Sequence, residues 1–213
     1  MCSIVLLHRP GHGWPVLIGA NRDEMRDRPW RAPGRHWADR PEVVAGIDLL
    51  AGGSWLGINA QGVVAAALNR INTLGPAPGY RSRGELVLEA LDHPDAAAAA
   101  LALADLDPAA YRPFNMVVAD NRDAWWLRNL GPEEGSGVVE VKPLPKGLSM
   151  ITAHDRNDLA SPRIRRFLPR FEAAAAPDPE RGDWSDWQAL LASREHGPEE
   201  GPAAAMSIAL ESG

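Results

Sequence analysis

The first apolar positions of the chain fall into two short runs that a turn separates. Ser3–Leu7 and Pro15–Ala20 are mainly apolar, and Arg9–Trp14 between them contains two glycines and a proline. This arrangement is typical of a β-hairpin. The next segment, Asn21–Arg40, holds ten charged residues and two prolines, so it predicts an irregular loop over one edge of a sheet.

Further apolar runs predict a mixture of strands and helices. The predicted strands are Glu42–Ile47, Ser54–Asn59, Val63–Asn69, Phe114–Ala119, Ala124–Arg128, Val138–Lys142 and Leu148–Ala153. The predicted helices are Ser82–Leu91, Asp95–Ala104, Ser161–Leu168 and Asp183–Ser193. Ser82 and Glu85 form a capping box for the first helix, and Pro169 interrupts the third. Strands, helices, strands, helices is an α+β order, with helical layers packed on antiparallel sheets.

Composition narrows the class of protein. The 213 residues, 45% of them hydrophobic and 23% charged, suffice for one core, so we expect a single domain over residues 1–213. The formal charge of −6 argues against a nucleic-acid partner. No apolar run resembles a signal peptide or a membrane span, so no membrane insertion is expected. The oligomeric state has no signal in the sequence.

The chain has one cysteine and six histidines. One cysteine excludes an internal disulfide and a multi-cysteine metal site, and it fits a reducing, cytoplasmic location. The histidines show no metal-ligand spacing. We therefore expect no metal and no cofactor.

That cysteine, Cys2, stands directly behind the initiator methionine. Removal of Met1 leaves a thiol and a free α-amine on one residue, a nucleophile with its own base. An α-amine titrates near pH ~7.7–8.0, so it can take the thiol proton at neutral pH. The plain alternative is a small apolar residue that begins a strand.

The predicted hairpin returns Asn21–Asp23 to the start of the chain. There the guanidinium of Arg22 would lower the pKa of the Cys2 thiol, and the carboxylate of Asp23 would orient the α-amine. The alternative is that Arg22 and Asp23 form one solvated loop pair among several. Asn69 and Asn115 are the candidate donors to an oxyanion. Their alternatives are a strand-end cap for Asn69 and a buried amide bound by backbone for Asn115.

Four further residues are candidates for substrate contact. They are Asn21, Trp55, Arg81 and Arg83. Asn21 adjoins the Arg22 and Asp23 pair. An exposed tryptophan can line an apolar pocket, although large aromatics more often belong to a core. The two arginines flank a helix start, where positive charge opposes the helix dipole, so an anionic ligand would explain them.

Five strings in order resemble the NRDE family, which includes the transport and Golgi organisation protein of animals. They are Met1-Cys2, Asn21-Arg22-Asp23-Glu24 with Arg28-Pro29, Ala45-Gly46-Ile47-Asp48, Gly52-Gly53-Ser54-Trp55-Leu56-Gly57-Ile58-Asn59 and Arg81-Ser82-Arg83-Gly84. The resemblance is dense up to about Leu91 and thinner beyond it. It implies a four-layer α-β-β-α sandwich of N-terminal nucleophile hydrolase type, with Cys2 as nucleophile. It also implies closing strands after Gly213, which this chain would lack.

Two functions follow from that resemblance. Relatives with this fold and an N-terminal cysteine, such as bile salt hydrolases and penicillin V acylases, cleave carbon–nitrogen amide bonds outside peptides. The animal members of the family are linked to haem mobilisation. The first hypothesis is therefore an amidohydrolase with a small-molecule amide substrate. The second is a binding or trafficking protein for an apolar ligand such as haem, on the same fold.

Overall fold

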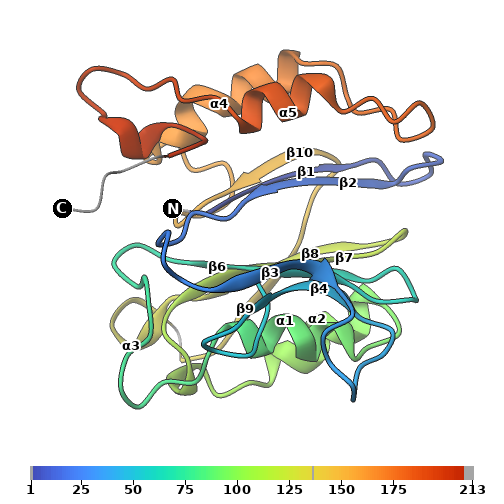
Figure 1. Ribbon diagram of the computed structural model, residues 1–213, viewed down its shortest axis with the longest axis vertical. Helices are drawn as coiled ribbons and strands as arrows, with labels where there is room; N and C mark the ends of the chain where they lie inside the picture. Colours follow the sequence, from blue (N-terminus) through green and yellow to red (C-terminus); the bar gives the residue numbers. More distant parts are fainter. Residues whose placement is uncertain (1, 136, 209–213) are drawn as a thin grey trace. The chain divides into compact units, whose positions relative to one another are not determined.

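Ten strands build two antiparallel sheets across residues 2–135 and 137–208, the part of the chain that the computed structural model describes. The residues group into two compact units. The first unit takes the chain up to Glu24 and again from Lys146 onward, and the second runs from Met25 to Pro145. Each unit has helices against one face of its sheet (Figure 1). The predicted α+β class is confirmed, and the single domain over residues 1–213 stays a prediction.

The first unit contains a three-stranded sheet in the order β10-β1-β2. Its elements are β1 (Ser3–His8), β2 (Val16–Asn21), β10 (Gly147–Ile151), α4 (Pro162–Ala173), α5 (Ser185–Leu191) and the 3₁₀ helix η2 (Pro202–Ala204). The hairpin is confirmed, since β1 and β2 pair antiparallel from His8 and Val16 to Ser3 and Asn21. Val5 of β1 and Met150 of β10 pack against apolar side chains of α4 and α5.

Helix α4 begins as predicted but continues past the proline that we expected to end it. The Ser161 hydroxyl accepts a 3.4 Å hydrogen bond from the backbone N–H of Ile164 at the helix start. Pro169 then lies inside the helix. Leu168 and Phe171 on either side of it are buried in one cluster, and this burial outweighs the backbone hydrogen bond that proline cannot make.

The second unit contains a seven-stranded sheet in the order β3-β4-β5-β6-β7-β8-β9. Its strands are β3 (Trp30–Gly34), β4 (Val44–Asp48), β5 (Leu56–Ile58), β6 (Val64–Asn69), β7 (Phe114–Ala119), β8 (Ala124–Asn129) and β9 (Glu140–Pro143). Its helices are α1 (Gly84–Leu91), α2 (Ala96–Ala104), η1 (Pro108–Ala110) and α3 (Gly131–Glu134). Apolar side chains of α1 and α2 pack on one face of this sheet in a single core cluster (Figure 1).

The prediction of an irregular loop over residues 21–40 is wrong in part, because this segment contains strand β3. Trp30 and Arg31 pair with Asp48 and Ile47, and the register then shifts before Gly34. An edge strand tolerates proline and charge because one side of its backbone pairs with no neighbour. The same composition that suggested a loop is thus typical of a protected sheet edge.

The start of α1 also differs from the prediction. Its N-cap is Arg83, whose side chain makes no capping bond, and the Ser82 hydroxyl accepts a 3.2 Å hydrogen bond from the N–H of Gly84 rather than of Glu85, so the predicted capping box does not form. Close backbone packing occupies this position instead, because a Cβ on Gly53 would lie 2.5 Å from the backbone of Gly84. The Gly84 carbonyl accepts a 3.1 Å hydrogen bond from the N–H of Ser54.

Two expectations concern residues outside the described ranges. They are the removal of Met1 and the chain's lack of closing strands at its C-terminal end, and both stay predictions. No helix within residues 2–135 and 137–208 combines the length and the apolar character that a bilayer crossing needs.

Candidate functional site

Cys2 lies directly before β1, beside the end of β2. The last residue pair of the hairpin joins Ser3 to Asn21, so the residues after Asn21 return to the chain start. The Cys2 thiol donates a 3.7 Å hydrogen bond to the backbone carbonyl of Asp23. The thiol is half-buried. The hairpin therefore places Asp23 next to the candidate nucleophile.

The surroundings of Cys2 favour the neutral thiol. Burial raises the pKa of this thiol above its ordinary value, and the negative charges of Asp23 and Glu24 act in the same direction. We expected Arg22 to lower this pKa, but its guanidinium lies 3.8 Å from the carboxylate of Glu24. At neutral pH the thiol is protonated, so attack requires a base close to the sulfur.

A buried ion pair adjoins the nucleophile. Arg163, in the first turn of α4, is 2% exposed. Its Nη1 donates a 2.9 Å hydrogen bond to Oδ2 of Asp23 and a 2.8 Å hydrogen bond to Oγ of Ser3. Its Nη2 donates to the carbonyl of Ala203 at 3.1 Å. The Asp23 carboxylate is thus fixed against the residue that follows Cys2.

Arg163 is not among the site residues that the sequence predicts. It lies 140 positions after Asp23, so no local pattern connects the two. One signal was present, because a cation in the first turn of a helix opposes the helix dipole. The dipole argument that singles out Arg81 and Arg83 applies equally to Arg163 in α4.

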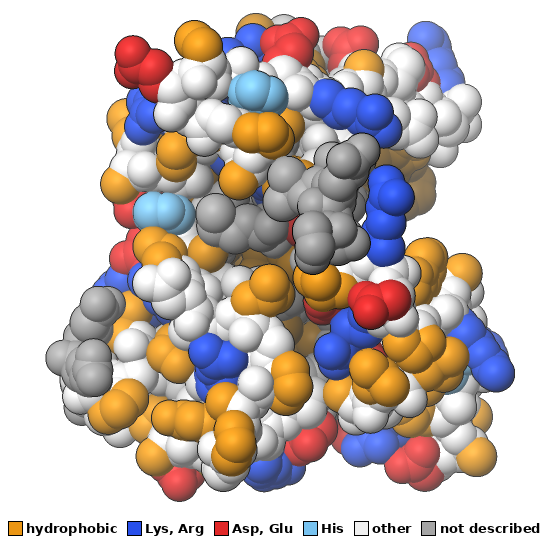
Figure 2. All heavy atoms as spheres, turned by 60° about the vertical axis from the view of Figure 1, so that its left-hand side comes forward, with side chains coloured by type: hydrophobic (Ala, Val, Ile, Leu, Met, Phe, Trp, Pro, Cys, Tyr) orange, Lys and Arg blue, Asp and Glu red, His pale blue; other side chains and the backbone are white. Residues whose placement is uncertain are grey.

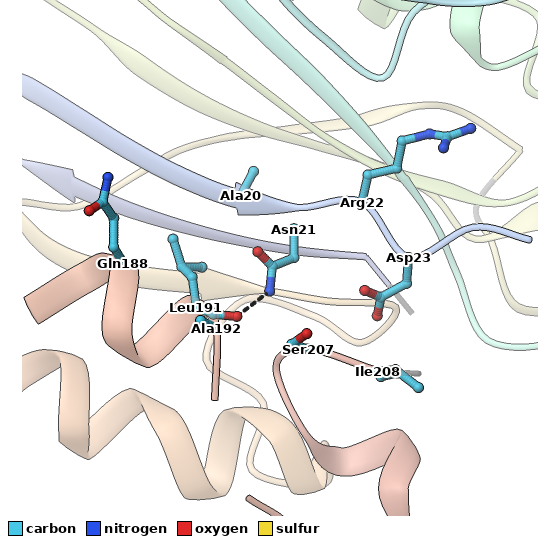
Figure 3. A pocket seen from close by; sticks show the side chains of 9 residues that line it. All are labelled: Ala20, Asn21, Arg22, Asp23, Gln188, Leu191, Ala192, Ser207 and Ile208. Atoms are coloured by element: carbon cyan, nitrogen blue, oxygen red, sulfur yellow. Dashed lines mark hydrogen bonds between the residues drawn. The ribbon is translucent and has the colours of Figure 1, made fainter. Parts of the chain in front are cut away.

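A pocket of about 410 Å³ opens beside this cluster, within the first unit (Figure 3). Its lining residues are Ala20, Asn21, Arg22, Asp23, Gln188, Leu191, Ala192, Ser207 and Ile208. Figure 3 shows Asn21 and Asp23 pointing toward α5 and Ser207, whereas Arg22 points to the opposite side of the chain. This is the alternation that an extended segment requires. Arg22 and Asp23, two predicted site residues, thus both belong to the pocket lining, together with apolar residues, but their side chains point to opposite sides.

Asn21 holds one wall of this pocket together. Its Nδ2 donates a 2.8 Å hydrogen bond to the carbonyl of Leu191, at the end of α5. A second 2.8 Å hydrogen bond goes to the carbonyl of Met206. Asn21 is therefore a structural link between β2 and the segment after α5, and its contact with substrate stays a prediction.

Asn69 and Asn115 belong to the second unit. Asn115 is fully buried, and its Oδ1 accepts hydrogen bonds from Nη1 of Arg70 at 2.8 Å and Nε1 of Trp126 at 3.2 Å. These partners are side chains, whereas we had considered backbone partners. The Nδ2 of Asn69 donates to the Arg70 carbonyl at 3.3 Å. The register pairs Leu68 with Asn115, so the two asparagine side chains leave the sheet on opposite faces. Their oxyanion roles stay predictions.

Trp55 makes a packing contact on the second sheet. A Cβ on Gly46 would lie 2.4 Å from its indole, so glycine is required where the ring crosses β4. The ring also meets Trp30 edge to face, with centroids 5.8 Å apart. Gly46 and Trp55, which belong to two different motifs of the resemblance, are thus in contact. Arg28 and Asp48 connect two such motifs in the same way, because Nε of Arg28 lies 2.6 Å from Oδ2 of Asp48.

Arg81 and Arg83 also make contacts within the second unit. Nη2 of Arg81 lies 2.7 Å from the Glu85 carboxylate. Nη1 of Arg83 donates to Oγ1 of Thr73 at 2.9 Å and to the Pro113 carbonyl at 3.0 Å. These bonds account for both cations at the start of α1 without a ligand, and substrate contact by either residue stays a prediction.

Across residues 2–135 and 137–208, no three His, Cys, Asp or Glu side chains lie together as a metal site requires. The groups that lie together beside the pocket are a thiol, a carboxylate and a guanidinium.

The fold has a solved counterpart. The chain matches the Caenorhabditis elegans orthologue of N-acylethanolamine-hydrolyzing acid amidase with a TM-score of 0.60 and 12% sequence identity, over 94% of this chain and 88% of that chain. The protein therefore has the fold of an N-terminal nucleophile hydrolase. At this identity the likeness shows the fold alone.

The sequence then gives the family. The pattern of the family Transport and Golgi organisation 2 matches residues 1–182, so the chain belongs to that family. The homologue of Mus musculus is 31% identical over 127 residues, and that of Bos taurus is 34% identical over 131 residues. Each alignment covers 56% of this chain and 45% of the relative, so the matched region spans less than half of those proteins.

Proposed function

We propose that this protein is an amidohydrolase whose nucleophile is Cys2, acting on a carbon–nitrogen amide bond of a small molecule. The observation that carries the proposal is the arrangement of Cys2, Asp23 and Arg163. The thiol lies 3.7 Å from the Asp23 carbonyl, and the carboxylate of Asp23 is held by a buried guanidinium. The fold supports it, since the solved counterpart is named as an amidase.

The proposed reaction begins after removal of Met1. The α-amine of Cys2 takes the thiol proton, and the sulfur attacks the amide carbonyl, so that a C–S bond forms and the carbonyl oxygen becomes an oxyanion. The predicted donors to that oxyanion are Asn69 and Asn115, and because they leave the sheet on opposite faces, one oxyanion accepts from at most one of them. The C–N bond then breaks while the α-ammonium protonates the leaving amine. A water molecule, deprotonated by the same amine, hydrolyses the thioester and releases a carboxylic acid.

Asp23 and Arg163 act on the base in this scheme. A carboxylate beside the new α-ammonium would orient it and favour its charged form. Arg163 is a positioning residue, because its hydrogen bonds fix the carboxylate. Arg22 is proposed to act on the Cys2 thiol through its charge and not to contact substrate.

A second candidate function is the binding of an apolar ligand in the same pocket. Ala20, Leu191, Ala192 and Ile208 supply apolar lining, and a neutral, half-buried thiol suits a binding site. Haem fits less well than another apolar ligand. Haem iron takes axial ligands such as His, Cys, Met or Tyr, and the described lining of the pocket holds none of these.

Small molecules are the proposed partners in either case. On the part of the surface that Figure 2 describes, positive and negative side chains are interspersed with apolar ones. A nucleic-acid backbone binds a continuous basic strip, which does not match this distribution or the formal charge of −6. We propose that the protein acts in the cytoplasm without insertion into a membrane.

Hydrolysis of N-acyl-aminomethylcoumarin amides with acyl chains of increasing length tests the first candidate. We expect release of fluorophore by the wild type, loss of release in Cys2→Ala, and a marked loss in Asp23→Asn. Asp27→Asn, an exposed carboxylate in the following loop, is the matched control and should retain the wild-type rate. Equal rates in Cys2→Ala and wild type would exclude Cys2 as the nucleophile.

Ligand titration separates the second candidate. Haem, followed by absorbance, and a fluorescent fatty acid are titrated into wild type and Cys2→Ala. Binding that survives the substitution, with no amide hydrolysed by the wild type, would favour the binding protein over the hydrolase.

A further inference from the structure

The sheet of the first unit has two edge strands, and the chain closes only one of them. Within residues 2–135 and 137–208, β10 and β2 each pair with β1 and with no other strand. At the β10 edge, the N–H and the carbonyl of Met150 are both bonded to Asn157. In the described part of the chain, no comparable bond reaches the outer side of β2. Strand β2 also contains no proline and no charged residue, which usually protect such an edge.

The register of the hairpin shows which residues of β2 turn their backbone outward. The N–H of Arg9 donates to the carbonyl of Pro15 at 2.7 Å, so these two residues form a hydrogen-bonded pair. Bonded and non-bonded pairs alternate along an antiparallel ladder. Ile18 and Ala20, three and five positions after Pro15, therefore belong to non-bonded pairs with β1. Their N–H and carbonyl groups point away from β1, where they can bond an added strand.

The pocket of the first unit lies along this outer edge. Its lining includes Ala20 and Arg22, whose side chains leave one face of the extended chain, and Asn21 and Asp23, whose side chains leave the other (Figure 3). A pocket that touches both sets spans the edge between the two faces. Ile18 is not among the lining residues. Of the two outward residues, Ala20 is therefore the one that adjoins the pocket.

Helix α5 flanks the same edge (Figure 3). It contributes Gln188 and Leu191 to the pocket lining. The helix approaches β2 closely because Gly19 has no side chain, since a Cβ there would lie 3.0 Å from Cδ1 of Leu191. Both lining side chains of α5 are uncharged, so the space beside the edge suits a neutral chain whose own N–H and carbonyl groups complement the backbone of Ala20.

The edge leads to the candidate nucleophile. Ser3 pairs with Asn21, so Cys2 lies across from Arg22, two residues beyond Ala20. A strand rises about 3.3 Å per residue, so two residues span about 7 Å. A chain that pairs with Ala20 thus reaches the level of Cys2 within two residues. Because β2 also runs toward this end, an acyl chain that ends at Cys2 lies parallel to β2.

We infer that the β2 edge binds the acyl part of the substrate as an added parallel strand, so that the preferred acyl groups carry peptide-like amides rather than a plain hydrocarbon chain. The Ala20 N–H donates to the carbonyl of one amide, and the Ala20 carbonyl accepts from the N–H of the next. The inference rests on the proposed function, in which the Cys2 sulfur attacks the carbonyl at the end of that acyl group.

Two fluorogenic substrates of equal length isolate the contact. Acetylglycylglycyl-aminomethylcoumarin carries two amides in its acyl group. Octanoyl-aminomethylcoumarin has the same number of main-chain atoms and neither amide. We expect the wild type to hydrolyse the first with a kcat/KM about tenfold higher, because an apolar chain leaves the outward groups of Ala20 without partners.

Ala20→Pro tests the donor of the edge. Proline has no N–H, and an edge strand tolerates it where that N–H faces outward. Ala20→Pro should lower the ratio of the two kcat/KM values by about tenfold, since the bound amide carbonyl loses its donor. Ile18→Pro removes an equivalent outward N–H outside the pocket lining, so this matched control should leave the ratio unchanged. Damage to the fold slows both substrates and cancels in the ratio.

Methylated substrates test the acceptor of the edge. In a parallel pairing, the N–H of the second amide points to the Ala20 carbonyl and that of the first amide points away. Methylation of the second nitrogen, in acetylglycylsarcosyl-aminomethylcoumarin, should lower kcat/KM by about tenfold. Methylation of the first nitrogen, in acetylsarcosylglycyl-aminomethylcoumarin, should have much less effect. Equal losses for both would contradict the parallel pairing and overturn the inference.

The outcomes separate this inference from the function on which it rests. Hydrolysis of both substrates with the same ratio in wild type and Ala20→Pro overturns the inference and leaves the hydrolase in place. If neither substrate is hydrolysed, the proposed function fails, and titration of acetylglycylglycinamide into ¹⁵N-labelled wild type decides the binding claim. Saturable shifts of the Ala20 N–H signal, lost in Ala20→Pro, support that claim, and their absence overturns it.

A second copy of the chain is the other possible occupant of this edge. Sedimentation velocity of wild type and Ala20→Pro detects it. Self-association that Ala20→Pro abolishes, with no change in the substrate ratio, would assign the edge to contact between copies and would overturn the inference.

Discussion

The two units differ in what they bury. The second unit packs its helix-facing core from apolar side chains such as Leu103, Met116 and Leu127. The first unit also has an apolar cluster, but it buries Arg163 in an ion pair with Asp23 beside the only cysteine. Taking ions out of water is costly unless each finds a partner. The buried ion pair of the first unit therefore marks a place where structure is constrained by chemistry rather than by packing alone.

The edges of the two sheets also differ. In the second unit, β3 carries Arg31 and Pro33 with a register shift, a usual protection against pairing with another chain. In the first unit, β10 is free of charge and proline, and a single residue closes its edge. The backbone N–H of Met150 donates to Oδ1 of Asn157 at 2.7 Å, and the Asn157 N–H donates to the Met150 carbonyl at 2.9 Å.

Breaking the ion pair should have the largest effect. Arg163→Met leaves the Asp23 carboxylate in a largely buried position without its partner, and such losses typically amount to about 3–5 kcal/mol. The free energy of unfolding in urea measures it. Arg165→Met, on the same helix with a half-exposed side chain, should cost much less.

A double substitution sharpens that test. Asp23→Asn removes the charge that Arg163→Met leaves behind, so the double variant should be more stable than the sum of the two single losses predicts. Additive losses would mean that the two side chains do not act as a pair.

The apolar core of the second unit should lose somewhat less. Leu103, on α2, is 1% exposed, and Leu103→Ala should lower the free energy of unfolding by about 3 kcal/mol through loss of packing and a residual cavity. Leu101, two positions earlier and 71% exposed, is the control, and Leu101→Ala should change stability by less than about 0.5 kcal/mol. Alkylation of Cys2 should be unaffected in the folded variants. Similar losses in both variants would contradict the assigned core.

The smallest effect concerns Asp120 and depends on pH. Burial alone would raise the pKa of this carboxyl, but hydrogen bonds from the backbone N–H groups of Ala96, Asp123 and Arg122 outweigh it and hold the pKa below its ordinary value. A carboxyl whose pKa is lower in the folded protein stabilises the fold at pH values above its unfolded pKa of ~3.9. This stabilisation is lost as the pH falls through the folded pKa. Asp120→Asn should therefore lose about 1 kcal/mol at pH 7 and less at pH 2 in urea unfolding. An equal loss at both values would contradict this account.

Much of the fold was predictable because local signals and tertiary contacts agree. The hairpin, the central strands of the second sheet and helices α1, α2 and α5 begin and end near the predicted residues, and α4 begins near its predicted start. The disagreements arise where tertiary contacts override local preference. Burial of Phe171 extends α4 beyond Pro169, and the backbone contact of Gly53 with Gly84 replaces the predicted cap of α1.

Of the candidate site, only the contact between Cys2 and Asp23, which the hairpin creates, was predictable from the sequence. Hairpin geometry alone brings Asp23 to Cys2, because the two strands have equal length. Arg163 arrives from a helix far along the chain, so its partner depends on the tertiary fold. The contacts of Trp55 and Arg83 are equally non-local, and they show packing where the sequence suggested a ligand.

The central claim is that a free N-terminal Cys2 is the nucleophile. The most direct measurement compares one protein before and after cleavage of an N-terminal extension that leaves Cys2 as the first residue, each form treated with a β-lactone probe and mapped by mass spectrometry. The account predicts rapid acylation of Cys2 only after cleavage, because only then does an α-amine adjoin the thiol. Equal labelling of both forms, or an adduct at another residue, would contradict it.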